Sequence, residues 1–375
     1  MKNGVWLEDL LPADLETCNS SSSFLQSGFW GSFKARFGWN ARSFTAVWRH
    51  ENRHPLLVIR RRLGPGVSFA YVPWGPELPP DFPSDPETSS AALLELTEGL
   101  RVFLPKDTAF IRFDPPWYTE EPGEPPSLRS PFIRAAADIQ APDTVLVNLQ
   151  GTWDDILGGM KSKWRYNSRL ALKRGVIIKR PDENGLDVFY FLLKETARRD
   201  GISIHNIEYY RILFSHCREY QDKENTHGSI NTSAPAVHLY TAEHEGDTLA
   251  AIMVLFRNRE AVYLYGASSD KKRNLMAPYA LQVHAMEEAR ERGCLEYDLF
   301  GIPPKEDPSH PMTGLYRFKT GFGGRIIHRS GSWDYPYRKL IMKVFYLVES
   351  LRKSLRDRKK SKKHHPLSPE ADIAR

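Results

Sequence analysis

Two stretches of the chain show the same succession of apolar and polar positions. Each contains two short apolar runs, a segment with helical spacing, and a further apolar run. These segments are 56–63, 69–76, 91–104 and 109–116 in the first stretch and 249–256, 261–268, 277–293 and 295–304 in the second. Short apolar runs predict strands, and apolar residues three or four positions apart predict helices. We therefore expect two α/β units of one architecture with a boundary near residue 145. Tyr71 corresponds to Tyr265 in this repeat, and Asp114 to Asp298.

The composition fits a folded protein of two domains. The chain has 375 residues, of which 41% are hydrophobic and 12% aromatic, so it has enough apolar surface to build cores. No run approaches the ~20 apolar residues of a transmembrane helix, and the N-terminus lacks the apolar core of a signal peptide. The three cysteines are far apart, which argues against disulfides and structural zinc. We expect a cytoplasmic protein.

The net charge of +6 is unevenly distributed, because two basic segments stand on an otherwise acidic chain. Residues 161–180 contain eight Lys or Arg and no acid, and residues 352–363 contain eight with one Asp. Such asymmetry favours a polyanionic partner. We expect 351–375 to be a disordered basic tail. It is either simply solvated or in loose contact with RNA or the anionic inner membrane surface.

The internal basic segment predicts a helix that begins near Met160 and ends at Gly175, a residue suited to a helix C-terminus. Its cations recur every fourth residue, which places them along one face. We call them the basic stripe: Lys161, Arg165, Arg169 and Lys173. No acid interrupts the stripe, and like charges four residues apart repel. We therefore expect the stripe to bind phosphates.

The repeated units, followed by the segment GLYRFKTGFGG, resemble acyl-CoA N-acyltransferases of the GNAT type. In that fold a glycine-rich loop at a helix N-terminus holds the CoA pyrophosphate through backbone N–H groups. The matching stretch here is 273–278, where Met276 and Pro278 replace the two small residues. Proline has no N–H to donate. We therefore expect the acyltransferase fold without the CoA site, and another activated acyl donor.

Seven segments in order resemble the Fem family of peptidoglycan-bridge aminoacyltransferases. They are FLQSGFWGSFK, AYVPWGP, FIRFDPP, MKSKWRYNSRLALKRGV, KETARRDGI, LYGASS and GLYRFKTGFGG. The resemblance covers most of residues 24–345. It implies two tandem GNAT-like domains with mixed sheets flanked by helices, and transfer of an amino acid from aminoacyl-tRNA to the stem-peptide amine of a peptidoglycan precursor. It also implies that the basic stripe contacts tRNA, and that no cofactor or metal is required.

The resemblance also assigns residues. Lys319 matches a family lysine thought to stabilise the oxyanion of the transition state, and Phe318 matches its aromatic neighbour. Lys34, in the segment that also holds Trp30, matches a lysine that binds the precursor's diphosphate. Without the motifs, both lysines would be read as ordinary surface residues.

The chain departs from the family pattern in two respects. Where the family has an arginine and a tyrosine four residues apart, this chain has His205 and Tyr209, so a histidine stands in place of the arginine. Because histidine carries less charge at pH 7, the contact with the diphosphate is either weaker or taken over by Arg198 or Arg199. Tyr265, in LYGASS, completes the expected precursor site. The long helical arm of some members is missing from 205–240, so the basic stripe is expected to take more of the tRNA contact.

Asp114, in FIRFDPP, is a candidate general base. Its alternative is a structural aspartate at a strand end, because an ordinary carboxylate is too weak a base for an ammonium group. His50, Glu51 and His54 spell the HExxH zinc-protease pattern, but that chemistry needs a helix. Strand patterns on both sides predict a polar hairpin turn instead.

The expected division of the chain is 1–145 for the first GNAT-like domain, 146–318 for the second, 319–350 for a segment returning to the first domain, and 351–375 for the tail. Two alternative functions remain open. One is an N-acetyltransferase that uses acetyl-CoA, and the other is a non-catalytic RNA-binding protein on this scaffold. The sequence does not identify the amino acid transferred, nor whether the precursor is nucleotide-linked or lipid-linked.

Overall fold

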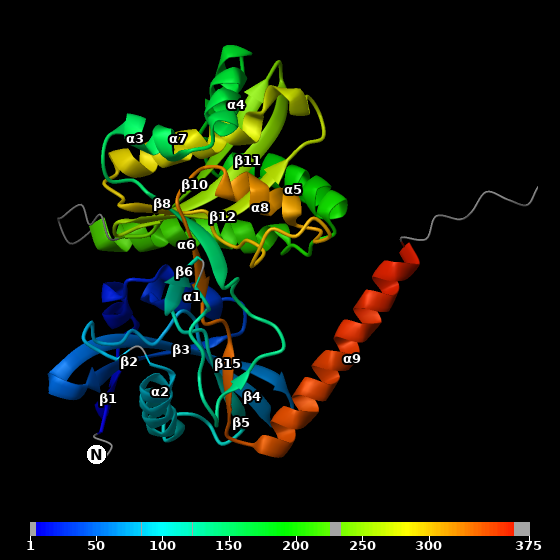
Figure 1. The fold of residues 1–375 in the computed structure, drawn as a ribbon. Helices are drawn as coiled ribbons and strands as arrows, with labels where there is room; N and C mark the ends of the chain where they lie inside the picture. Colours follow the sequence, from blue (N-terminus) through cyan, green and yellow to red (C-terminus); the bar gives the residue numbers. More distant parts are fainter. Residues whose placement is uncertain (1–4, 84, 122, 226–233, 364–375) are drawn as a thin grey trace, which may run out of the picture.

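Two mixed β-sheets, each covered by helices, lie one beside the other along the long axis of the protein (Figure 1). The computed structural model describes residues 5–83, 85–121, 123–225 and 234–363. The first sheet holds most of the N-terminal third of the chain, and the second sheet holds most of the middle and C-terminal parts.

The first sheet has the strand order β1-β2-β3-β4-β5-β15-β7, and only β4 and β5 run parallel. Its strands are β1 (Leu7–Ala13), β2 (Asn40–Trp48), β3 (Asn52–Gly64), β4 (Val67–Val72), β5 (Thr108–Phe113), β7 (Ile133–Arg134) and β15 (Trp333–Pro336). Alternate side chains of a strand face opposite sides. Leu56 and Val58 therefore pack with helix α2 (Pro86–Arg101), whereas Leu57 and Ile59 pack with α1 (Gly28–Ala35).

The second sheet has the strand order β6-β14-β8-β13-β12-β11-β10-β9, and β12 runs parallel to β13. Its strands are β6 (Tyr118–Glu120), β8 (Asp143–Asn148), β9 (Ile177–Lys179), β10 (Ala236–His244), β11 (Asp247–Arg257), β12 (Glu260–Ser268), β13 (Glu296–Asp298) and β14 (Arg325–Arg329). The remaining helices are α3 (Trp153–Gly159), α4 (Ser162–Lys173), α5 (Leu186–Asp200), α6 (Ile207–Asn225), α7 (Ala277–Glu291), α8 (Thr313–Thr320) and α9 (Lys339–Lys363). Helix α7 covers one face, and α5 and α6 cover the other.

The repeat expected from the sequence is present in both sheets. In each unit an antiparallel pair is followed by a helix and then by a strand parallel to the second member of the pair: β3, β4, α2 and β5, then β11, β12, α7 and β13. Tyr71 pairs with Ile59, and Tyr265 pairs with Met253, so the two tyrosines occupy equivalent positions. The predicted fold class is confirmed.

One hydrophobic core joins the two units. Helix α1 of the first unit packs on α6 of the second, with the rings of Phe33 and Tyr209 5.1 Å apart and those of Phe29 and His216 5.2 Å apart. Buried aromatic pairs of this kind contribute beyond their area. Buried residues of both units therefore share one cluster at the junction.

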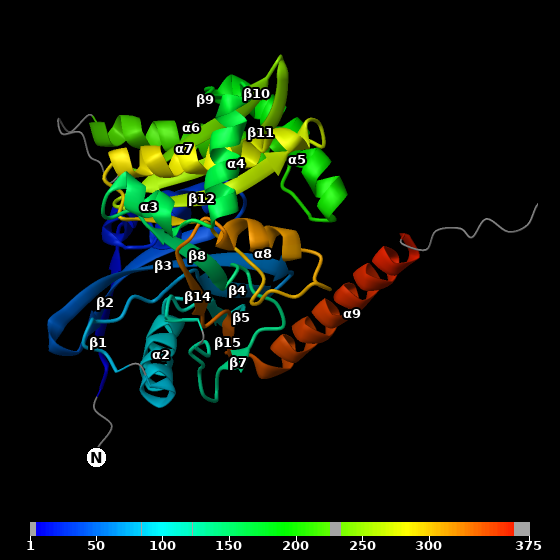
Figure 2. The same ribbon diagram turned by 45° about the horizontal axis from the view of Figure 1, so that its top comes forward.

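The chain returns to the first sheet near its C-terminus. The expected division at 318/319 falls within α8, and β14 still belongs to the second sheet, so the return begins after Arg329. Strand β15 then pairs with β5. Helix α9 follows and extends from the body (Figure 2).

Two further predictions can be compared with the structure. The HExxH segment lies in the β2–β3 hairpin, with a short 3₁₀ turn over Arg49–Glu51, so the predicted polar turn is confirmed. Residues 351–363, expected to belong to a disordered basic tail, continue α9, because the helical spacing of 340–351 runs on into the basic segment. Residues 364–375 lie outside the described part of the chain. Among the described residues, no helix is long and apolar enough to cross a bilayer.

Candidate active site

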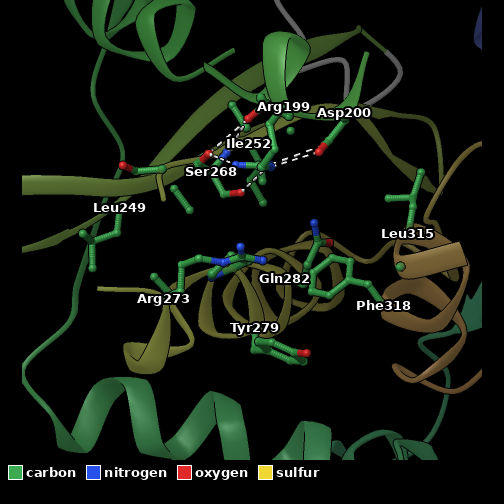
Figure 3. A pocket seen from close by; sticks show the side chains of 18 of the residues that line it. Arg199, Asp200, Leu249, Ile252, Ser268, Arg273, Tyr279, Gln282, Leu315 and Phe318 are labelled. Atoms are coloured by element: carbon green, nitrogen blue, oxygen red, sulfur yellow. Dashed lines mark hydrogen bonds and ion pairs between the residues drawn. The ribbon is translucent and has the colours of Figure 1, made fainter. Parts of the chain in front are cut away.

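A cavity of about 790 Å³ opens in the second unit at the end of β12 (Figure 3). In Figure 3, Arg199 and Ser268 lie on one wall, and Arg273, Tyr279 and Gln282 lie on the opposite wall. The 273–278 loop contributes to the lining, with Met276 in the left-handed conformation at φ 59° and α7 beginning at Ala277. The cavity is thus lined in part by the stretch that matches the CoA-binding loop of the acyltransferases.

Lys319 lines this cavity and is almost fully buried, with 6% exposure. Its Nζ donates hydrogen bonds of 2.9 Å to the carbonyl oxygens of Phe300 and Gly301 and lies 5.1 Å from the centre of the Tyr263 ring. Burial lowers the pKa of Lys319 to about 7, and the charge of Asp298 acts in the opposite direction. The side chain is therefore held in one place and titrates near neutral pH.

Phe318 also lines the cavity and ties α8 to its neighbours. Its carbonyl oxygen accepts a hydrogen bond of 2.8 Å from Trp164 Nε1, and its ring contacts Tyr279 and Phe322. Trp164 is on α4, so this contact fixes the helix that carries Lys319 against the helix that carries the basic stripe.

The glycine after α8 makes this arrangement possible. A Cβ on Gly321 would overlap the Trp164 indole, although the backbone at Gly321 is ordinary helix. We expect Gly321→Ala to destabilise the protein by about 1–3 kcal/mol, as overpacking does, and to lower the melting temperature. Gly314→Ala is the matched control, because a Cβ there meets no atom within 4 Å. It should be neutral or mildly stabilising. Equal melting temperatures for the two variants would contradict this packing.

Gln282 and Tyr263 are site residues that the motifs did not identify. Gln282 is fully buried in the cavity wall, and its Oε1 accepts a hydrogen bond of 2.9 Å from Tyr297. Its Nε2 has no hydrogen-bond partner among the described residues. A buried donor without a partner costs about 1–3 kcal/mol. The sequence signal that could have identified Gln282 is the position of a glutamine on the apolar face of α7.

A second group of predicted residues lies at the junction of the two units. Lys34 Nζ on α1 faces the rings of Trp30, Trp39 and Tyr209, with distances of 5.3, 5.7 and 5.7 Å to the ring centres. Within the part of the chain that the structure describes, no carboxylate forms an ion pair with Lys34. Burial, together with the charge of Arg61, lowers the pKa of Lys34 to about 8. We call Lys34, Trp30, Trp39, Tyr209 and His205 the Lys34 cluster.

His205 and Tyr265 extend the cluster. The His205 ring stacks on Tyr209 at 3.8 Å, and burial, followed by the charge of Lys34, lowers its pKa. A side-chain hydrogen bond links Tyr209 to Tyr265, and Tyr265 also packs edge-on against Tyr210. The structure thus brings together Lys34, Trp30, His205, Tyr209 and Tyr265, which were predicted to bind the precursor.

A β-bulge in β12 separates the cavity from the Lys34 cluster. Val254 pairs with Tyr263 while the adjacent Met253 pairs with Tyr265, so one extra residue of β12 lies between the two pairs. The bulge reverses the alternation of side chains. Tyr263 consequently packs on the α7 side beneath Lys319, and Tyr265 packs with the core shared by α1 and α6.

Two predicted residues lie elsewhere. Arg199 is in the cavity wall rather than in the Lys34 cluster, where Asp200 and Asp270 pair with it. Asp114, after β5, is buried, accepts hydrogen bonds from Tyr71 and Ser332, and does not line the cavity. Burial raises the pKa of Asp114 to about 6. These contacts match the alternative in which Asp114 is a structural aspartate at a strand end and not a general base.

The four residues of the basic stripe differ in their surroundings. Helix α4 begins at Ser162 instead of Met160, because 153–159 form the separate helix α3 with its own capping box at Thr152 and Asp155. Arg165 is half-buried and donates to the carbonyl oxygens of Leu157, Gly158 and Met160 at the end of α3. The other members, Lys161, Arg169 and Lys173, are exposed.

Among the described residues, no group of three or more His, Cys, Asp or Glu side chains is arranged to hold a metal ion.

Comparison with known proteins identifies the family and related folds. The FemAB family model matches residues 130–225 and 218–350, together more than half of the chain. Proteins described as lipid II:glycine glycyltransferase are similar to it: one from Staphylococcus epidermidis is 25% identical over 264 residues, and one from Staphylococcus aureus strain USA300 is 26% identical over 270. Each match covers 58% of this chain and 63% of the relative.

The fold is also similar to a solved structure. The crystal structure of FemX aligns with a TM-score of 0.71 and 19% sequence identity, covering 90% of this chain and 100% of the other. At that identity the likeness concerns the arrangement of the chain.

Proposed function

Because the chain belongs to the FemAB family, we propose that it transfers an amino acid from aminoacyl-tRNA to the stem-peptide amine of a peptidoglycan precursor. The observation that carries the proposal is the arrangement around β12. A buried lysine in a cavity lies on one face of this strand, and a lysine among aromatic rings lies on the other. The names of the relatives make glycine and lipid II the first substrates to test.

In the proposed reaction the neutral amine nitrogen attacks the ester carbonyl carbon of the aminoacyl-tRNA. The new C–N bond forms, the carbonyl oxygen carries the negative charge of a tetrahedral intermediate, and the bond to the tRNA ribose oxygen then breaks. The amine loses a proton, and the departing ribose oxygen gains one. Such chemistry depends mainly on orientation and on charge stabilisation.

The cavity supports the role of the donor site. Lys319 is held by two carbonyl oxygens, so its ammonium group is oriented before the substrate binds. Preorganised donors of this kind stabilise an oxyanion at little reorganisation cost. We propose that Lys319 faces the developing oxyanion and that the Phe318 ring packs against the aminoacyl group.

The Lys34 cluster supports the role of the acceptor site. An ammonium group with three aromatic neighbours and no carboxylate partner in the described chain is available to a phosphate oxygen. His205 lies on Tyr209 beside it and adds a second nitrogen donor. We propose that this cluster binds the diphosphate of the precursor, with Tyr265 ordering Tyr209.

The exposed members of the basic stripe support a contact with tRNA. Arg169→Ala with Lys173→Ala should weaken binding of all tRNAs alike, because phosphate contacts carry no sequence information. The log–log salt slope should fall by about 1.8 at most, as for two duplex-like phosphate contacts. Fluorescence anisotropy at several salt concentrations measures both quantities. Arg62→Ala with Lys106→Ala removes two exposed charges from the first unit and should change neither. An effect confined to precursor binding would assign the stripe to the acceptor.

The proposed donor can be tested directly. The protein is incubated with a pool of aminoacyl-tRNAs and with either nucleotide-linked or lipid-linked precursor, and the acceptor is analysed by mass spectrometry. We expect one aminoacyl mass increment that needs aminoacyl-tRNA and does not appear with acetyl-CoA. Chelation by EDTA should leave the rate unchanged with prefolded tRNA. Acetylation with acetyl-CoA alone would favour an N-acetyltransferase, and tRNA binding without transfer would favour a non-catalytic RNA-binding protein. Since aminoacyl-tRNA is the donor, we place the reaction in the cytoplasm.

A further inference from the structure

Helix α9 has two apolar faces, and only one of them is covered. On the inner face Met342 is buried, the Phe345 ring lies 5.1 Å from the Phe110 ring, and Tyr346 donates a hydrogen bond to the buried carboxylate of Asp334. These contacts hold the first turns of the helix on β5 and β15. The N-terminal part of α9 is therefore attached to the body.

The outer face of α9 is a row of exposed apolar side chains. We call this row the apolar stripe: Leu340, Val344, Leu347, Val348 and Leu351. Its members are 37–79% exposed, and their spacing of four, three, one and three residues places them on one side of the helix. Figures 1 and 2 both show α9 leaving the body, and the exposure of the stripe means that none of the described elements covers it. Contiguous exposed apolar surface of this kind marks an interaction site.

The same helix is strongly basic. Its sequence contains ten Lys or Arg and two acids, and Lys339 and Lys343 lie exposed beside the apolar stripe. A helix with an apolar face and many cations is typical of segments that lie in the interface of an anionic membrane. Each basic residue near such a surface adds to the attraction.

We propose that α9 docks on an anionic lipid bilayer, with the apolar stripe inserted among the lipid chains and its cations near the headgroups. RNA would satisfy the cations and leave the apolar stripe in water. A second copy of the helix would cover the stripe but bring like charges together. An anionic bilayer covers the apolar stripe and also provides negative headgroups for the cations. This inference concerns attachment and stands apart from the proposed transfer reaction.

Vesicle sedimentation tests the proposal with the full chain. Vesicles of phosphatidylcholine alone are compared with vesicles that also contain phosphatidylglycerol, in the absence of any peptidoglycan precursor. We expect binding to the anionic vesicles that weakens as salt is raised. Val344→Ser with Leu347→Ser should weaken this binding by roughly tenfold or more, because two apolar side chains no longer enter the bilayer.

The matched control is Val102→Ser with Ile177→Ser, which alters two exposed apolar residues outside α9. This control should bind vesicles like the unaltered protein. Both double variants should keep the melting temperature, since the altered side chains are exposed. Unchanged vesicle binding by Val344→Ser with Leu347→Ser would overturn the proposal. Concentration-dependent dimers that this variant abolishes, without vesicle binding by the unaltered protein, would assign the stripe to self-association instead.

An activity measurement extends the test and rests on the proposed function. With a lipid-linked precursor in anionic vesicles, the Val344→Ser with Leu347→Ser variant should transfer more slowly than the control. With a nucleotide-linked precursor in solution, the two should be equal. Absence of transfer by every form would contradict the proposed function and leave the vesicle-binding result standing. An equal loss of transfer rate with both precursors would contradict the inference that α9 aids transfer by holding the protein on the bilayer.

Discussion

Lys319→Met is expected to lower kcat by roughly 10²–10³ while both substrates still bind. The oxyanion forms only in the transition state, so the loss of a group aimed at it affects kcat more than KM. Loss of one oxyanion donor in other enzymes has an effect of that size. Single-turnover kinetics with prebound aminoacyl-tRNA measures the chemical step directly.

The control for this variant is Lys271→Met. Lys271 also lines the cavity, but it is exposed and paired with Asp247, so its removal deletes one positive charge without touching the oxyanion site. It should change kcat little. Equal kcat values for the two variants would contradict the role of Lys319. Melting temperatures accompany the kinetics, because Lys319→Met leaves the carbonyl oxygens of Phe300 and Gly301 without their donor.

The pH profile provides a separate readout of the same group. Lys319 stabilises an oxyanion only when protonated, and burial lowers its pKa to about 7. With both substrates saturating, the kcat of the unaltered protein should therefore fall as the pH rises above about 7, while deprotonation of the acceptor amine raises it from the acid side. The falling limb should be absent from Lys319→Met.

Lys34→Met is expected to raise KM for the precursor by roughly 10–100-fold with kcat nearly unchanged. A hydrogen bond to a charged group contributes about 1.5–3 kcal/mol, and the diphosphate is remote from the bond being formed, so its contact is uniform through the reaction. Methionine retains the packing against Trp30, Trp39 and Tyr209. Because burial, together with Arg61, lowers the pKa of Lys34 to about 8, precursor affinity of the unaltered protein should fall as the pH rises through that value.

Arg36→Met is the control, since Arg36 lies two residues further along the chain, is exposed and pairs with Glu219. It deletes one charge beside the Lys34 cluster and should leave KM for the precursor unchanged. If Lys34→Met lowered kcat at constant KM, the roles of Lys34 and Lys319 would have to be exchanged.

The repeat and the family resemblance were accessible from the sequence because both are local. Strand and helix periodicity needs only neighbouring residues, and the matching registers of Tyr71 and Tyr265 follow from two copies of one pattern. The motif around Lys319 singled out this lysine as a candidate site residue without any geometry. The HExxH segment could be read as a turn for the same reason, since strands on both sides left no room for a helix.

Burial, partners and relative position depended on tertiary structure. Arg165 looked equivalent to Arg169 from spacing alone, but a break at Met160 brings the end of α3 within reach of Arg165. Arg199 lies in the cavity wall, where it pairs with Asp270, a residue distant in sequence.

The amino-acid sequence alone predicted two α/β units of one pattern and showed that the charge is unevenly distributed. Its motifs also singled out Lys319 and Lys34 as candidate site residues. Only the folded chain decided that Tyr263 and Tyr265 face opposite sides, because one bulged residue in β12 breaks the alternation that the sequence implies. It likewise decided that Lys319 is buried and Lys34 lies among aromatic rings, and hence that both pKa values are lowered. Desolvation depends on what packs around a group, and those neighbours come from segments far apart in the chain.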